Sequence, residues 1–402
     1  MKMMTSTSTA LPKLRASATR FRRLGIAGFL AAVSLLGLGC SGGDENDLLL
    51  FPAIVAVDSE LNRVFVVDNQ FNGLNVVDPL IDQVQTFGGS DEPLLDGEDE
   101  QLLPLFPANA AVTALPGGVS RLFVVGGGVA PMNQVTVLDF DDVNLIRRAP
   151  FSPISVAGTE EDFLPGVTVA PEQGLLFVSN SASGMVHAYQ VESGVEAVGS
   201  PIAVGGIPGR MSFDPVSGLL VVSNAGLTTV SFIDADDLAA PVQTLEVGMT
   251  TRDAALASNG SGSALFVNGT QLNVARVFRL NLANLPASVQ LFELAPNAPD
   301  VPIPDPNFVP GTLNYAKAAP LSDGRVAGFF TMSTGDLVEL DLSPDLTTLT
   351  PAITLVGAIS AEGLDTYVNA SGQATKAYYA SPGVGTLTAV NPLNNLFLDQ
   401  IP

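Results

Sequence analysis

The chain of 402 residues carries 40 acidic and 17 basic residues, so its formal net charge is −23 at pH 7. A surface this acidic repels the phosphate backbone of DNA and RNA, which excludes a nucleic-acid-binding protein. Hydrophobic residues make up 47% of the chain and charged residues only 14%. This composition excludes a disordered acidic stalk and predicts a large packed core.

Residues 1–39 have the features of an export signal. They include basic residues but no acidic residue, and the run from Leu24 to Gly39 is apolar or small except for Ser34. Such a run is long enough for the core of a signal peptide and short for a membrane span. We therefore predict a signal peptide over residues 1–39. An uncleaved N-terminal anchor is the alternative.

The only cysteine of the chain, Cys40, directly follows Gly-Leu-Gly at residues 37–39. This arrangement resembles the lipobox of bacterial lipoproteins, although Gly37 stands where that family usually has leucine. The resemblance implies cleavage before Cys40, a diacylglyceryl group on its sulfur, and residues 40–51 as a lipidated tether to a membrane. Ser41 rather than an aspartate follows the cysteine, which in a diderm host implies the outer membrane.

Residues 52–402 contain seven copies of one pattern, with a period of about 50 residues. Each copy has short apolar, β-branched runs separated by Gly, Asn, Asp and Ser, a pattern typical of strands joined by hairpins. A single four-stranded blade cannot bury both faces, whereas seven blades in a ring bury each other. The sequence predicts an all-β chain: a seven-bladed β-propeller of four-stranded antiparallel blades. Residues 395–401 are expected to form an outer strand of the last blade.

Two of these copies also resemble a known family. Residues 177–180 (Phe-Val-Ser-Asn) and 221–224 (Val-Val-Ser-Asn), each followed by another strand-like run, are similar to YVTN-type β-propeller repeats. The resemblance implies the propeller fold. It does not select a function, because the family includes surface-layer and adhesion-like proteins, lactonase-like enzymes and quinoprotein-like domains.

An acidic insertion at residues 88–108 interrupts the repeat. Asp96, Glu98 and Asp99 offer the hard oxygen ligands that Ca²⁺ prefers, so they are the candidate metal ligands and calcium is the candidate cofactor. The segment lacks the ligand spacing of an EF-hand loop. A solvated charge run is the alternative.

Arg210 and Arg252 precede Gly218 and Gly260 by the same interval, so they occupy equivalent positions in adjacent blades. Both open the first strand of a blade, which we predict to be the innermost strand. Two guanidinium groups near the mouth of the channel could hold an anionic ligand through bidentate contacts. The alternative is structural: each arginine pairs with a carboxylate of its blade, such as Asp214 or Asp253.

Catalytic side chains are scarce. His187 is the only histidine and lies on a strand-like run, so we expect it to pack between blades or face solvent. A Ser-His-Asp triad would need this one residue, and no nucleophile-elbow motif accompanies it. The sequence thus predicts a cell-envelope lipoprotein whose propeller is a non-enzymatic binding or scaffolding module for an envelope protein or polymer. A metal-dependent lactonase or hydrolase using channel carboxylates is the alternative.

Overall fold

The computed structural model describes residues 52–68, 73–85, 103–104, 106–126, 130–141, 145–271, 274–294, 311–354 and 361–402. The predicted signal peptide, Cys40 and the tether lie outside these residues. The same holds for Asp96, Glu98 and Asp99. Among the described residues, no helix is long and apolar enough to cross a membrane.

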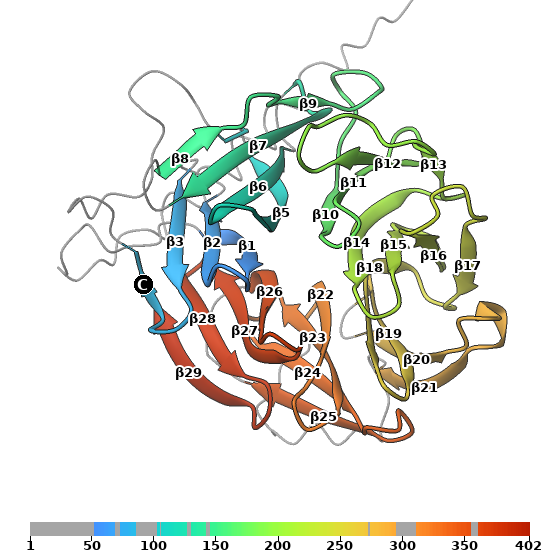
Figure 1. The fold of residues 1–402 in the computed structure, drawn as a ribbon. Helices are drawn as coiled ribbons and strands as arrows, with labels where there is room; N and C mark the ends of the chain where they lie inside the picture. The colour runs from blue at the N-terminus through green and yellow to red at the C-terminus, as the bar shows by residue number, and fades with distance from the viewer. Residues whose placement is uncertain are drawn as a thin grey trace, which may run out of the picture. The chain divides into compact units, whose positions relative to one another are not determined.

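Seven antiparallel sheets follow one another along the chain, and each sheet is one blade (Figure 1). Blade one is β1 (Pro52–Asp58), β2 (Arg63–Asp68), β3 (Leu74–Asp78) and β4 (Gln83–Val84). Blade two is β5 (Pro107–Leu115), β6 (Val119–Gly126), β7 (Gln134–Asp141) and β8 (Leu145–Arg148), with β9 (Ile154–Ser155) also paired to β7. Blade three is β10 (Gly166–Ala170), β11 (Leu175–Asn180), β12 (Met185–Gln190) and β13 (Ile202–Ala203).

The remaining four blades repeat this order. Blade four is β14 (Pro208–Asp214), β15 (Leu219–Asn224), β16 (Thr229–Asp234) and β17 (Gln243–Glu246). Blade five is β18 (Thr251–Asn259), β19 (Gly262–Gly269), β20 (Ala275–Leu280) and β21 (Val289–Leu294), with a short 3-10 helix at Leu285–Ala287. Blade six is β22 (Leu313–Pro320), β23 (Val326–Met332), β24 (Leu337–Leu342) and β25 (Leu349–Thr354). Blade seven is β26 (Glu362–Val368), β27 (Ala374–Ser381), β28 (Thr386–Asn391) and β29 (Leu396–Ile401).

The first strand of every blade lies at the centre of the ring. The contacts between these strands run from β1 to β5, β10, β14, β18, β22 and β26, and β26 contacts β1 again. The second strands lie behind them and are buried along almost their whole length, as in β11 (Leu-Leu-Phe-Val-Ser-Asn). Because neighbouring blades cover both faces, these strands are almost continuously apolar instead of alternating.

A separate apolar cluster fills each junction between neighbouring blades, including the junction of blade seven with blade one. The predicted seven-bladed, all-β propeller is therefore confirmed. The C-terminal strand β29 pairs with β28 as the outermost strand of blade seven, as the sequence predicted. Within the described residues, blades one and seven exchange no strand, and they meet there through side-chain packing and polar contacts.

Candidate functional site

The centre of the ring holds a cavity of about 430 Å³ that is lined by residues from the first strands of all seven blades. Each first strand has one neighbour in its blade, so its other edge leaves backbone N–H and C=O groups facing the channel. Unpaired groups of this kind are costly away from water. The channel therefore needs side chains that satisfy them, and two aspartates do so.

Asp365 and Asp253 each join the inner strand of their own blade to that of the next. Asp365 Oδ1 accepts the N–H of Thr366 at 2.9 Å, and Oδ2 accepts the N–H of Val57 in blade one at 2.9 Å. Asp253 Oδ1 accepts the N–H of Ala254 at 2.8 Å, and Oδ2 accepts the N–H of Ala316 in blade six at 3.0 Å. Both carboxylates therefore act as bridges within the scaffold.

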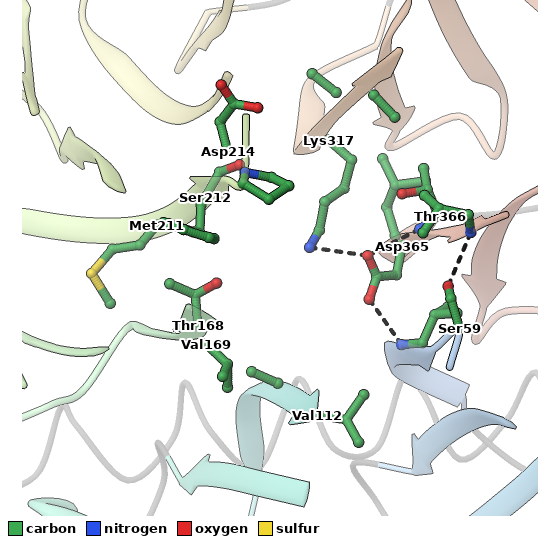
Figure 2. A pocket seen from close by; sticks show the side chains of 18 of the residues that line it. Ser59, Val112, Thr168, Val169, Met211, Ser212, Asp214, Lys317, Asp365 and Thr366 are labelled. Carbon is green, nitrogen blue, oxygen red and sulfur yellow. Dashed lines mark hydrogen bonds and ion pairs between the residues drawn. The ribbon is translucent and has the colours of Figure 1, made fainter. Parts of the chain in front are cut away.

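Lys317 brings a positive charge into this cavity. Its Nζ lies 3.1 Å from Asp365 Oδ1, and about a third of the side chain (34%) is exposed. Figure 2 shows Lys317 pointing into the pocket, with Thr168, Val169 and Met211 on walls formed by other blades. An ammonium group has three donors, so the ion pair with Asp365 leaves donors that a bound molecule can use.

Arg210 spans the channel from blade four to blade six. Its Nη1 donates to the backbone carbonyl of Asn314 at 2.7 Å and lies 3.9 Å from Asp253 Oδ2. Its guanidinium carbon lies 3.5 Å from the centre of the Tyr315 ring, a close cation–π contact. Burial acts to lower the pKa of Arg210, but Tyr315 and Asp253 outweigh that effect and the pKa is raised.

Arg252 occupies the start of the neighbouring inner strand and is half-buried. It has no hydrogen bond or ion pair with any residue that the structure describes. Burial lowers its pKa, and the positive charge of Arg210 lowers it further. The two arginines thus lie near one another at the channel, in the innermost strands where the sequence placed them.

The structural alternative for these arginines holds only in part. Arg210 does pair with Asp253, but Asp214 is a wrong partner because it ends its strand, at the opposite end of the channel. There Asp214 accepts hydrogen bonds from Ser217 and from Ser258 of blade five. Asp58 has the same role toward Ser120 of blade two. These strand-ending carboxylates tie neighbouring blades together.

His187 is buried on β12, with 2% of its surface exposed, which excludes the solvent-facing alternative. Its Nδ1 lies 3.1 Å from Glu196 Oε1. The nearby Ser200 hydroxyl donates to the same oxygen at 2.8 Å, so serine and histidine meet the carboxylate and not each other. A triad requires serine bonded to histidine, so this trio lacks that order. No group of three acidic, cysteine or histidine residues suited to a metal ion occurs in the described part of the chain.

Sequence reasoning missed Lys317, Asp365 and Tyr315. One signal was available, because Lys317 and Lys376 are the only lysines after residue 39. Lys317 is also the only lysine in the first strand of any described blade. The partners of such a residue come from other blades, and the spacing of a single repeat does not identify them.

Comparisons with known proteins support the fold alone. The sequence matches no family model, and no curated protein matches it. The structure is similar to that of a functionally unknown protein from Desulfotomaculum acetoxidans, with a TM-score of 0.51 and 12% identity over 86% of this chain and 94% of that one.

Two further solved structures match at lower similarity. One is hydrazine synthase of Kuenenia stuttgartiensis, with a TM-score of 0.47 and 10% identity over 90% of both chains. The other is a chain of a nidogen/laminin complex, with a TM-score of 0.44 and 9% identity over 70% of this chain and 93% of that one. At these identities the likeness says nothing about ligand or activity.

Proposed function

We propose that the protein is an exported lipoprotein whose YVTN-type propeller is a non-enzymatic binding module, with the central cavity as its binding site. The observation that carries this proposal is the partly exposed Lys317 side chain within a cavity formed by all seven blades. Concave sites with a few placed polar groups are the usual form of ligand sites. The ligand is a small polar molecule, or the end of an envelope polymer, that presents a hydrogen-bond acceptor to Lys317.

The state of the channel carboxylates favours binding over the metal-dependent hydrolase. A hydrolase of that kind needs carboxylate oxygens free to hold a cation. Asp253 and Asp365 each accept two backbone N–H groups and face a positively charged side chain. Their lone pairs are therefore used to hold blades together.

A ligand screen on the full-length protein in detergent tests the cavity. Thermal shift and calorimetry with polysaccharide fragments, sugars and lactones should identify a binder whose affinity falls at least tenfold in Lys317→Met. Arg279→Gln is the matched control, because it removes an exposed cation on β20. A binder that is unaffected by Lys317→Met would place the site elsewhere. Lactone turnover that disappears with EDTA would support the hydrolase instead.

The anchor and the acidic segment need separate tests. Several acyl chains on Cys40, at about 0.8 kcal/mol per buried CH₂, would hold the protein stably on a membrane. Cys40→Ser should therefore release the protein or stall its precursor, and a processed mutant that stays membrane-bound would exclude lipidation. If the acidic segment binds Ca²⁺, replacing Asp96, Glu98 and Asp99 with their amides should abolish a calcium-induced rise in melting temperature.

A further inference from the structure

Irregular pairing at the start of two inner strands places two arginines beside the channel. In blade four the register shifts between Pro208 and Met211, and in blade five it shifts between Thr251 and Asp253. Arg210 and Arg252 lie within these two shifts. A β-bulge adds a residue that is left out of the ladder and re-aims its side chain. The bulges therefore explain why charged side chains can leave the packed faces of these blades.

The surroundings of the two arginines differ. Arg210 is held by one hydrogen bond to Asn314, by the Tyr315 ring and by Asp253, which leaves most of its N–H donors available. Arg252 has neither a hydrogen bond nor an ion pair with a described residue, and it does not line the 430 Å³ cavity. Two guanidinium groups that approach each other in a partly buried place repel, and arginine cannot relieve the repulsion by losing its proton. Only an anion can relieve it.

Two carboxylates of the protein, those of Asp253 and Glu362, lie near the arginines, but neither forms an ion pair with Arg252. Asp253 is buried and accepts two backbone N–H groups, so its oxygens are largely used. Glu362, at the start of the inner strand of blade seven, is half-buried and lies near both arginines without forming an ion pair with either. Burial raises the pKa of Glu362, although the two arginines act against that rise. Both carboxylates act to raise the pKa of Arg252 without forming an ion pair with it.

We propose that Arg252, with Arg210 beside it, binds a carboxylate group of a ligand at the end of the channel where the first strands begin. The planar fork of a guanidinium matches a carboxylate through two parallel N–H···O bonds. Arg210 is held in place by Asn314 and Tyr315, so one half of the site is organised before the ligand arrives. Arg210 lines the central cavity and Arg252 does not, so this site adjoins the Lys317 cavity while its principal residue lies outside it.

The test uses succinate as the probe and succinamide as its uncharged analogue, at constant ionic strength, with the full-length protein. Calorimetry should detect succinate but not succinamide. Arg252→Gln should weaken succinate at least tenfold, and Arg252→Lys should weaken it less, because the charge remains while the fork is lost. Arg279→Gln and Lys317→Met should bind succinate as the wild type does.

A melting curve without ligand separates a lost site from a lost fold. Removing an unpaired, partly buried cation should leave the melting temperature of Arg252→Gln equal to or above that of the wild type. Unchanged succinate affinity in Arg252→Gln would overturn the proposal, as would the absence of succinate binding to the wild type at millimolar concentration. Loss of succinate binding in Lys317→Met alone would assign the carboxylate to the central cavity instead.

Discussion

The two faces of blade seven differ in how they bury polar groups, and Tyr378 and Tyr379 display the difference. These neighbours on β27 point to opposite faces, so Tyr378 packs against blade one and Tyr379 against blade six. The Tyr378 hydroxyl donates to Asp82 of blade one, which also pairs with Lys376. Toward blade six, the buried carboxylate oxygens of Glu339 have no hydrogen-bond partner among the described residues.

The difference follows from how the chain reaches each junction. Blades six and seven are consecutive in the sequence, so the chain itself brings them together. Blades one and seven are the first and last of the ring, and their meeting must be specified by contacts. We call the junction of blades one and seven the seam. Three further pairs form polar contacts across it: Asp365 with Val57, Ser59 with Val368, and Tyr367 with Asn62. Directional hydrogen bonds fix the register there, and apolar packing supplies most of the stability.

Deleting residues 396–402 should lower the stability of the propeller more than any other change considered for the two faces of blade seven. Strand β29 pairs along β28, so its loss leaves β28 as an unpaired edge beside Leu387 and Val390, which are buried. Because blade seven closes the ring, we expect the whole propeller to melt several degrees lower in one cooperative transition. Circular dichroism and calorimetry would measure it. An unshifted melt would show that closure does not depend on an intact last blade.

The seam itself should be sensitive to Asp82→Ala. The change leaves the Tyr378 hydroxyl without its acceptor, and it leaves the mostly buried Lys376 ammonium with the carbonyl of Pro79 but no counter-charge. We expect a loss of about 3 kcal/mol in the free energy of unfolding, the range for breaking a buried ion pair. The backbone of Asp82 has a φ of 53°, a conformation that asparagine tolerates better than alanine.

Asp82→Asn is therefore the matched control. It keeps the turn and an acceptor for Tyr378 while it removes the charge, so its cost should be smaller. Denaturant titration of both variants would measure the two costs. Equal effects of the two substitutions would show that the ion pair alone matters at this seam.

On the face of blade seven toward blade six, removing a buried carboxylate should raise the stability instead of lowering it. Glu339 has no exposed surface, and alternation along β24 places it with Asp341 toward blade seven. Burial, and then the neighbouring Asp341, raises the pKa of Glu339 to about 10. Folding therefore takes up a proton between the ordinary pKa of glutamate and pH 10. The stability that depends on this proton is complete at low pH and is lost as the pH rises through that window.

Glu339→Gln keeps the shape of the side chain and removes its titration. The variant should be more stable than the wild type at pH 8 by at least about 1 kcal/mol, because the wild type must take up a proton on folding at that pH and glutamine need not. The difference should vanish near pH 4 and widen toward pH 10. Melting temperatures across that range would measure it, and a gap that does not change with pH would show that Glu339 is not protonated in the folded state.

The sequence predicts the ring better than it predicts the channel. The seven blades depend on local strand and turn patterns, which repeat and so reinforce one another. The position of Arg210 and Arg252 at the start of inner strands also followed from the repeat. The contact of Arg210 with Asn314 did not, because the two residues are 104 positions apart and meet only when the ring has closed.

Two asparagines near the end of a second strand, Asn180 and Asn268, show the same limit on sequence-based prediction. Asparagine after the second strand predicts a local turn, and Asn180 fulfils this by accepting the N–H groups of Ala182 and Ser183. Asn268 stands at a similar position, yet its side chain accepts the N–H of Asp253 in the neighbouring strand at 2.7 Å. The bulge at Arg252 brings that N–H within reach of Asn268. The residues around Asn268 in the sequence do not predict this contact.

The smallest expected effect is the sharpest test of the two faces. Tyr378→Phe removes a buried hydroxyl that donates to Asp82, so we expect a loss of about 1 kcal/mol, the usual net value of one hydrogen bond. Tyr379→Phe removes a hydroxyl with no hydrogen-bond partner among the described residues, so its effect should be near zero or stabilising. Denaturant titration of both variants would compare the two faces directly. Each substitution removes a single hydroxyl oxygen, and the two tyrosines are neighbours on the same strand. In the Asp82→Ala background, Tyr378→Phe should cost less than it does alone, since its acceptor is already gone. A larger cost for Tyr379→Phe than for Tyr378→Phe would reverse the comparison between these two tyrosines.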